Sequence, residues 1–285
     1  MTGWLLSAPA LLVLALAFLW PMLGLFRISL NRTAETGAME AALTAETYAK
    51  VTGDPYYWGL AWDTLVLSAG ASAIAAALAL PVVLLIRRAS PRWRAPLALM
   101  AVSPLLISGT ARVVGWRAIL GDLGLINVAL GWFGLTSAPV PLINNWTGVW
   151  IGLVESLMPY AVLVLIAGLG RLDPRLEEAA ATLGAGRSRT FLRVTLPLAA
   201  PALGGAFLLG LVLGISAFIT PRLMGGGRVF TVATEIYDQA LTTVDWPVAA
   251  VLAMLLLLAL LAVMLLRGVL AGMAKRTQAG EGRVA

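Results

Sequence analysis

The stretch WPVAAVLAMLLLLALLAVMLLRGVL, residues 246–270, contains a single charged side chain, Arg267. An α-helix rises about 1.5 Å per residue, so about 20 consecutive apolar residues cross the hydrocarbon core of a bilayer. Surface helices of soluble proteins are amphipathic and carry polar side chains along one face. The stretch therefore predicts a membrane-spanning helix.

The composition of the whole chain extends this prediction. Of its 285 residues, 60% are hydrophobic and 12% are charged. A soluble domain has about 45–50% apolar and about 25% charged residues, so this chain has too little charge to cover a surface in water. It also has neither Cys nor His. This excludes disulfides, thiolate nucleophiles, histidine proton relays, and zinc or haem sites built on imidazole or thiolate.

Five further apolar stretches have the length of a membrane span: residues 4–26, 62–86, 95–120, 146–170 and 199–220. We therefore expect an all-α integral membrane protein with six transmembrane helices in one domain, residues 1–285. The first stretch could instead be a secretory signal. However, it lacks a basic start, is too long for the apolar part of a cleaved signal, and contains Pro9 and Pro21. A transmembrane β-barrel would show short alternating segments instead of continuous apolar runs.

The basic residues are distributed unevenly between the two sides of the predicted membrane domain. Most of the 20 Lys and Arg lie in the connections 87–94 and 171–193 and in the tail from residue 267 onward. Positive charge collects on the cytoplasmic side of membrane proteins, which predicts that both termini are cytoplasmic. This topology explains the net charge of +6 without a nucleic-acid partner.

The connection between the fourth and fifth spans is longer than a simple turn requires. It reads RLDPRLEEAAATLGAGRSRTFLRVTLPLAAP, residues 171–201. Asp173 and Pro174 predict a helix start and Gly184 a left-handed stop, which gives a short helix at about 174–183. A second helical piece, 187–195, should end before Pro197. Two short helices joined at a glycine predict a docking surface.

This connection also carries a motif. Its residues are Glu178, Ala179, Ala180, Gly184, Val194, Leu196 and Pro197. Their spacing resembles the EAA motif, EAA-x3-G-x9-I-x-LP, of the membrane subunits of ATP-binding-cassette importers, and Val194 in place of Ile is the only departure. The resemblance covers about residues 4–270 in span number, orientation and loop placement.

Within this superfamily the chain is most similar to the spermidine/putrescine-type permeases. The segments that carry this similarity are residues 111–127, Pro159-Tyr160, residues 219–227 and Asp245-Trp246-Pro247. Permeases for ferric ion, thiamine, phosphonates or opines share much of the same pattern. These four solutes are therefore alternatives to a polyamine as the substrate.

The resemblance implies a type I importer permease fold and a multi-pass location in the bacterial inner membrane. It also implies a cytoplasmic coupling loop, 171–198, whose ATPase-coupling residues are Glu178, Ala179, Ala180, Gly184, Leu196 and Pro197. The expected partners are a second, related permease, two ATP-binding subunits and a periplasmic binding protein that delivers a small polar solute, best matched by a polyamine. The chain has no GxxxxGK[ST] phosphate loop, so ATP and Mg²⁺ are expected on the separate ATPase, and the chain is expected not to be an enzyme.

Two of the charged residues inside predicted spans lie well away from the span ends. Arg112 in the third span and Glu155 in the fourth lie at similar depths. An unpaired charge there costs roughly 2.5–3.5 kcal/mol or more, so both should face the interior of the bundle or an aqueous cavity. They either form a structural ion pair, or Glu155 belongs to a cation pathway. Weaker candidates for the pathway, with packing or loop solvation as the alternative, are Trp116, Tyr160, Asn127 and Glu235.

Two other classes of membrane protein compete with the importer subunit. A self-contained secondary transporter predicts inverted repeats and coupling groups within the membrane, whereas this sequence has one unpaired docking loop. A membrane-embedded hydrolase would need a nucleophile with its base, and the absence of His and Cys disfavours it.

Overall fold

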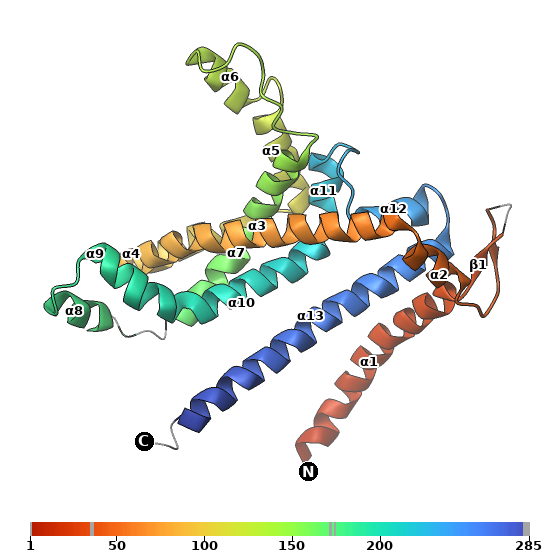
Figure 1. Ribbon diagram of the computed structural model, residues 1–285, viewed down its shortest axis with the longest axis horizontal. Coiled ribbons are helices and arrows are strands. Elements are labelled where there is room, and N and C mark those ends of the chain that lie inside the picture. The colour runs from red at the N-terminus through yellow and green to blue at the C-terminus, as the bar shows by residue number, and fades with distance from the viewer. Residues whose placement is uncertain (1, 35–36, 171–172, 174, 282–285) are drawn as a thin grey trace. The chain divides into compact units, whose positions relative to one another are not determined.

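The computed structural model describes residues 2–34, 37–170, 173 and 175–281. Almost all elements are helices (Figure 1). Within the described residues, six helical stretches are long and apolar enough to cross a membrane: Ser7–Ser29, Pro55–Arg88, Gly109–Trp132, Trp146–Leu169, Arg187–Ile215 and Trp246–Leu265. The prediction of an all-α protein with six spans is therefore confirmed.

The chain divides into two compact units, which are described one at a time. The first combines residues 1–59 with 232–285. Its elements are α1 (Thr2–Ser29), β1 (Arg32–Thr33), β2 (Met39–Glu40), α2 (Glu46–Gly53), the start of α3 (Pro55–Arg88), α12 (Val232–Leu241) and α13 (Trp246–Glu281). The helices α1 and α13 contact each other and run in opposite directions, so the start of α1 and the end of α13 lie at the same end of this unit (Figure 1).

Asp245 fixes the beginning of α13. Its Oδ1 accepts a hydrogen bond from the backbone N–H of Val248 at 3.1 Å, which is the bond of a helix N-cap, and a second from the Thr33 hydroxyl at 2.7 Å. Because Thr33 belongs to β1, which pairs antiparallel with β2, one carboxylate joins the small sheet to the sixth span.

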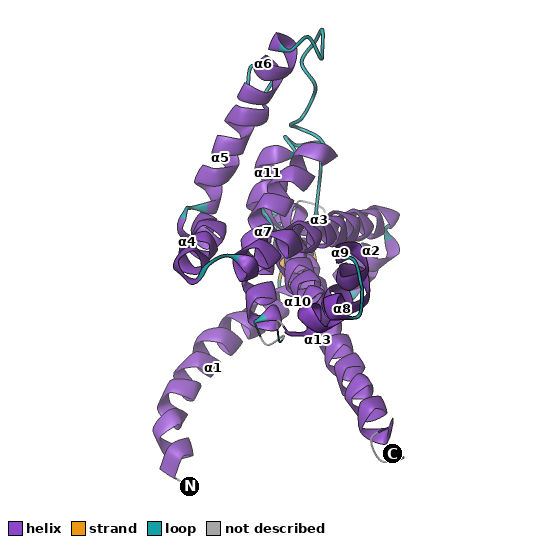
Figure 2. Cartoon of the chain, turned by 90° about the vertical axis from the view of Figure 1, so that its left-hand side faces the viewer, coloured by secondary structure: helices purple, strands orange, loops and turns teal. Residues whose placement is uncertain are grey.

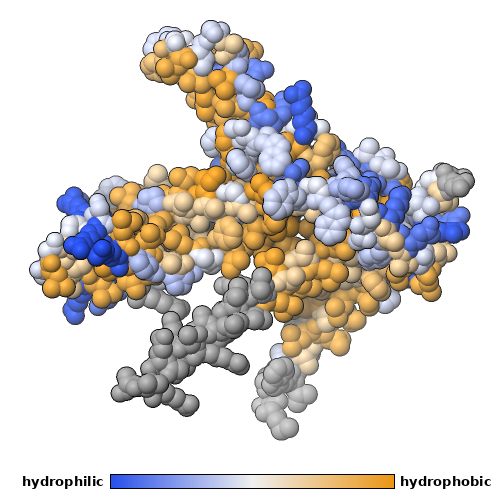
Figure 3. Space-filling view, viewed as in Figure 1, coloured by the Kyte–Doolittle hydropathy of each residue, from blue (hydrophilic) through white to orange (hydrophobic). Residues whose placement is uncertain are grey.

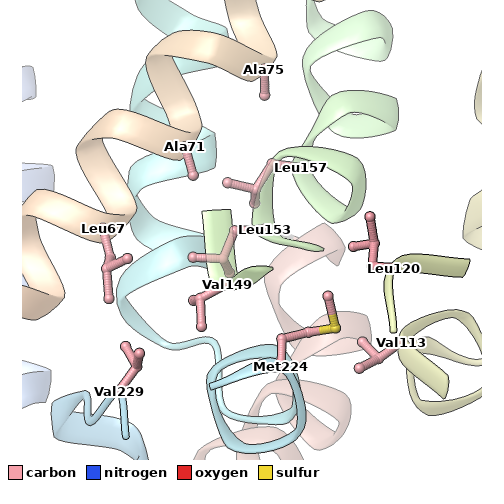
Figure 4. Packing of buried hydrophobic residues seen from close by; sticks show 10 residues of the cluster. All are labelled: Leu67, Ala71, Ala75, Val113, Leu120, Val149, Leu153, Leu157, Met224 and Val229. Carbon is pink, nitrogen blue, oxygen red and sulfur yellow. The ribbon is translucent and has the colours of Figure 1, made fainter. Parts of the chain in front are cut away.

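The second unit comprises residues 60–231. After α3 its elements are α4 (Pro91–Val102), η1 (Ser103–Leu106), α5 (Gly109–Leu120), α6 (Leu125–Trp132), α7 (Trp146–Leu169), α8 (Arg175–Thr182), α9 (Arg187–Thr190), the π-helical turn η2 (Phe191–Thr195), α10 (Leu196–Ile215) and α11 (Ile219–Met224) (Figure 2). One buried cluster joins α3, α5, α7 and α11 through apolar side chains that include Leu67, Val113, Leu153 and Met224 (Figure 4).

Small residues let α10 approach α3 closely. A Cβ atom added at Gly214 would lie 3.0 Å from the Cβ of Ser68, and one added at Gly210 would lie 2.9 Å from the Oγ of Ser72. Both distances are shorter than a comfortable contact, so the two glycines and the two serines form a matched surface. The Gly210-x3-Gly214 pattern thus packs helices within this chain.

The third span is not the continuous helix 95–120 that the sequence predicts. The helix α4 ends at Val102, η1 follows, and Ile107 is extended before α5 begins at Gly109. The reason is Pro104, which has no N–H to continue the α-helical hydrogen bonds and whose ring crowds the preceding turn. The apolar crossing is therefore shifted to Gly109–Trp132.

The expected helix end before Pro197 is also wrong. The chain stays helical from Arg187 to Ile215, because η2 joins α9 to α10. The N–H of Leu196 bonds to the carbonyl of Phe191, five residues earlier, instead of four. Pro197 lies in the first turn of α10, directly after this wider π turn, which gives room for a ring that would clash with the carbonyl of Arg193 in a regular α-helix.

Apolar side chains cover much of the visible surface of the long helices, and hydrophilic residues gather at the end that carries α8 and α9 (Figure 3). Large exposed apolar residues occur along the spans, for example Leu14 in α1 and Leu258 in α13. A bilayer accommodates such a surface, whereas water would not.

Candidate coupling segment and buried charge pair

The helix α8 begins and ends close to where the sequence predicts. The carboxylate of Asp173 accepts a hydrogen bond from the N–H of Arg175 at 2.9 Å. At the other end Gly184 has φ +80°, and its N–H bonds to the carbonyl of Ala181 at 3.0 Å. This left-handed closure confirms the predicted stop. Arg171, Leu172 and Pro174 of the predicted loop lie outside the described residues.

Most of the motif residues are accessible. Glu178, Ala179, Gly184 and Pro197 are exposed, whereas Ala180 and Leu196 are partly buried. Leu183, directly before the glycine, is 88% exposed. An acidic side chain beside exposed apolar ones is typical of a surface that another protein covers.

Glu177, the neighbour of the motif glutamate, makes the contacts that hold α8. One carboxylate oxygen lies 3.1 Å from the guanidinium of Arg88 at the end of α3, and the other accepts a hydrogen bond from Thr195 in η2 at 3.1 Å. Thr195 is buried. Glu177 is not identified from the sequence, because its partners lie far away in the chain and no spacing rule connects them to α8.

A cavity of about 870 Å³ opens between α8, α9, η2 and the end of α3. Its walls combine charged, hydroxyl-bearing and apolar side chains, among them Leu84, Arg88, Glu177, Arg187, Thr190 and Phe191. The α8 helix is therefore tethered at Glu177 and only loosely packed elsewhere.

The two charged residues that lie deep in the predicted spans are in contact. Arg112 projects from α5 and Glu155 from α7, and their side chains approach to 3.4 Å (Nη1 to Oε1) with exposed fractions of 13% and 19%. The same guanidinium donates to the carbonyl of Pro104 at 3.3 Å and to the Ser156 hydroxyl at 3.4 Å. The two side chains are thus placed as an ion pair, the first of the two roles considered from the sequence. Arg112 also contacts Pro104, at which the predicted third span is interrupted.

A second cavity, of about 360 Å³, lies next to this pair. It shares Ser156 with the pair's surroundings, and its lining mixes hydroxyl groups with apolar side chains: Gly109, Ser156, Ser216, Ala217, Phe218, Ile219 and Thr220. Arg112 and Glu155 do not line this space themselves, but Ser156, whose hydroxyl lies 3.4 Å from the Arg112 guanidinium and 3.5 Å from the Glu155 carboxylate, does.

The other predicted pathway residues occupy different positions. Trp116 is one helical turn from Arg112 on the same face of α5 and packs against the buried cluster. Tyr160 is 36% exposed, and five residues at 100° each place it on a different face of α7 from Glu155. Tyr160 is thus not part of the arrangement around the pair.

Asn127 and Glu235 are held by neighbouring groups. The Asn127 side chain donates to the carbonyls of Gly121 and Val140 and accepts from the N–H of Val140, so it fixes the loop after α6. The buried carboxylate of Glu235 accepts hydrogen bonds from Tyr56 at 2.9 Å and from Gln239 at 2.8 Å. These contacts give both residues a structural role.

Six apolar spans and an exposed helix with a glycine stop define a multi-pass membrane protein. Residues 5–275 match the family described as "Binding-protein-dependent transport system inner membrane component". The chain belongs to this family and is a permease subunit of the bacterial inner membrane.

Several relatives carry a transport name. The chain is 33% identical over 205 residues to the spermidine/putrescine transport system permease protein PotB of Haemophilus influenzae, which covers 72% of this chain and 71% of the relative. The protein of the same name from Escherichia coli K12 is 28% identical and covers 74% and 77%. The ferric transport system permease protein FbpB of Actinobacillus pleuropneumoniae is 25% identical over 87% of this chain but only 35% of its own length.

Solved structures support the fold. A chain of a bacterial alginate ABC transporter, crystallised with an alginate pentasaccharide-bound periplasmic protein, superposes with a TM-score of 0.71 at 21% identity and covers 93% of each chain. A second structure of an alginate importer gives a TM-score of 0.65 at 19% identity. At these identities the likeness shows the permease fold alone.

Proposed function

We propose that this chain is the permease subunit of an ATP-driven importer for a polyamine such as spermidine or putrescine. The observation that carries the proposal is the 33% identity to a permease with this name over most of both chains. The chemistry around α7 is compatible with it, because the carboxylate of Glu155 lies 3.5 Å from the hydroxyl of Ser156, and Ser156 lines a cavity with hydroxyl and apolar walls. A polyamine combines cationic amines with apolar methylene segments.

The proposed assembly contains this chain, a second permease, two ATP-binding subunits and a periplasmic binding protein. The two permeases would each supply half of the transmembrane pathway. Both termini would be cytoplasmic. This agrees with the distribution of Lys and Arg, and with the fact that the start of α1 and the end of α13 lie at the same end of their unit. ATP and Mg²⁺ would bind only to the separate ATPase.

In this assembly the loop 171–198 would dock on the ATPase. The exposed residues Glu178, Ala179 and Gly184 provide the contact, and Leu183 provides an apolar anchor. Displacement of α8 would be passed on through Glu177, which is bound to Arg88 at the end of α3 and to Thr195 directly before α10. Two membrane spans would therefore respond to one docking event, as a rigid-body change of access requires.

Uptake of labelled solutes by the cells that naturally make this chain tests the proposal. Deletion of the chain should abolish uptake of spermidine or putrescine and leave thiamine and ferric-ion uptake unchanged, and re-expression should restore it. If the deletion instead abolishes ferric-ion or thiamine uptake and leaves polyamine uptake intact, the substrate is ferric ion or thiamine and not a polyamine. Co-purification with an ATP-binding subunit separates the importer from a self-contained transporter, which needs none.

A further inference from the structure

The ion pair between Arg112 and Glu155 is loose for a pair of partly buried charges. A guanidinium and a carboxylate usually meet at about 2.7–2.9 Å, often through two parallel hydrogen bonds. Here the closest approach is 3.4 Å, and the bonds of the guanidinium to Pro104 and Ser156 are 3.3 and 3.4 Å long. The buried Nε of Arg112 has no hydrogen-bond partner among the described residues.

Glu155 is equally under-used. One carboxylate oxygen faces the guanidinium, and the other is 3.5 Å from the Ser156 hydroxyl. An ionised carboxylate can accept about four hydrogen bonds, so these two contacts from the described residues leave part of its capacity unused. A pair whose task is to lock α5 to α7 would satisfy both groups, because each missing bond in a buried site costs stability.

The unused capacity suits a primary ammonium group. An alkylammonium is compact, has three donors, and can approach a carboxylate oxygen more closely than the 3.4 Å of the single Arg112 Nη1 contact here. The 360 Å³ cavity reaches Ser156, the residue after Glu155, and offers apolar walls from Ala217, Phe218 and Ile219 for the methylene segments of such a molecule. The site therefore fits one end of an alkyl-diamine or a related polyamine.

We propose that Arg112 is a resident counter-ion that the ammonium group of the substrate replaces on Glu155 during transport. The inference rests on the polyamine function proposed above. In the empty transporter the guanidinium neutralises Glu155, which avoids the cost of an isolated charge inside the membrane. When an ammonium group binds Glu155, the guanidinium stays close through the carbonyl of Pro104 and the hydroxyl of Ser156.

This exchange limits how tightly the substrate is held. Binding requires the displacement of Arg112, and the returning guanidinium competes for the same carboxylate and promotes release. A permeation site must bind strongly enough for entry and weakly enough for exit, and an internal competitor provides that balance. Arg112 would thus set the affinity of the site, and Glu155 would be the group that recognises the cation.

Equilibrium dialysis of labelled spermidine against the complete permease–ATPase complex, purified without its binding protein, tests the exchange. Arg112→Gln should lower the dissociation constant by about tenfold and slow uptake in cells, because the competitor is gone and release is slower. Glu155→Gln should raise the dissociation constant by about tenfold or more. In the double variant, the loss of Arg112 should give no gain in affinity.

Two controls separate this effect from a general change of charge. Arg117→Gln removes a guanidinium from the same helix, where it bonds to the carbonyl of Leu223, and should leave the dissociation constant unchanged. Arg112→Lys keeps a competing cation and should show no tightening. Size-exclusion chromatography of each complex reports whether the variant assembles.

The outcomes are distinct. If wild-type cells import no polyamine, the proposed function fails and the exchange fails with it. If they do import it, but Arg112→Gln binds spermidine no more tightly, only the exchange is overturned. If Arg112→Gln and Glu155→Gln both fail to assemble and the neutral double variant assembles, the pair is a structural lock, which also overturns the exchange.

Discussion

Glu177 accepts a hydrogen bond of 3.1 Å from the hydroxyl of Thr195, and this bond joins α8 to the π turn before α10. Thr195 is only 3% exposed, whereas the Glu177 side chain is 30% exposed and both residues line the cavity, so the bond is partly shielded from water. The ion pair of Glu177 with Arg88 involves an arginine side chain that is 68% exposed, and such pairs contribute about 0–1 kcal/mol. The tether of α8 therefore depends mainly on Thr195.

Replacing Glu177 should loosen the link between docking and transport. Glu177→Ala removes both contacts, and losing a hydrogen bond to a charged group costs about 1.5–3 kcal/mol. We expect uptake to fall several-fold more than ATP hydrolysis, measured as solute imported per ATP hydrolysed in proteoliposomes. Glu177→Gln keeps an acceptor for Thr195 and should retain most of the coupling. If Glu177→Ala and the wild type import the same amount of solute per ATP hydrolysed, Glu177 does not transmit the movement of α8 to the spans.

A side chain at Gly184 should disturb the turn that ends α8. For a residue with a Cβ atom, the left-handed conformation that Gly184 adopts at φ +80° costs roughly 1–2 kcal/mol. We expect Gly184→Ala to reduce uptake and Gly184→Trp to uncouple it from ATP hydrolysis, since the bulky ring also obstructs the proposed docking surface.

The matched control is Gly186→Ala. Gly186 has φ −67°, is exposed, and has open space where a Cβ atom would be added, so alanine fits there without strain. Uptake by this variant should equal that of the wild type. Unchanged uptake in Gly184→Trp would count strongly against the coupling role of this loop.

The contact between α10 and α3 should tolerate no added side chain. An alanine at Gly214 would bring its Cβ to 3.0 Å from the Cβ of Ser68, and overpacking of this kind costs about 1–3 kcal/mol. The melting temperature of the detergent-solubilised protein should fall for Gly214→Ala. It should stay unchanged for Gly204→Ala, a position in the same helix with nothing within 4 Å of the added atom. Equal melting temperatures for the two variants would show that α10 and α3 can move apart to admit the added methyl group without loss of stability.

Features encoded locally could be predicted from the sequence. The number of spans followed from the length of the apolar runs, and the end of α8 followed from Gly184, because only glycine takes the left-handed conformation readily. The sequence also predicted that Arg112 and Glu155 could meet, and the structure brings them to 3.4 Å, although the span 95–120 from which the depth of Arg112 was counted is shifted to Gly109–Trp132.

The effect of a proline on the continuity of a helix could not be predicted from the sequence. Pro104 breaks the third span, whereas Pro197 is accommodated by a π turn and leaves the helix continuous. A proline alone does not decide between these outcomes, because the result depends on whether the preceding turn can widen within its packing. The tether at Glu177 escaped prediction for another reason: it requires knowing that the end of α3 and the turn η2 meet beside α8.

Asp245 should stabilise the sixth span and the small sheet together. Its Oδ1 caps α13 through Val248 and accepts from Thr33 in β1, so Asp245→Ala removes both bonds, and loss of a cap alone costs about 1 kcal/mol. Asp245→Asn keeps a capping oxygen and should lose less stability. We expect the melting temperature to fall in the order wild type, Asn, Ala, and limited proteolysis of the segment around Thr33 to accelerate in the same order. If Asp245→Ala melts like the wild type and its β1 segment is cleaved no faster, this carboxylate does not join the two elements.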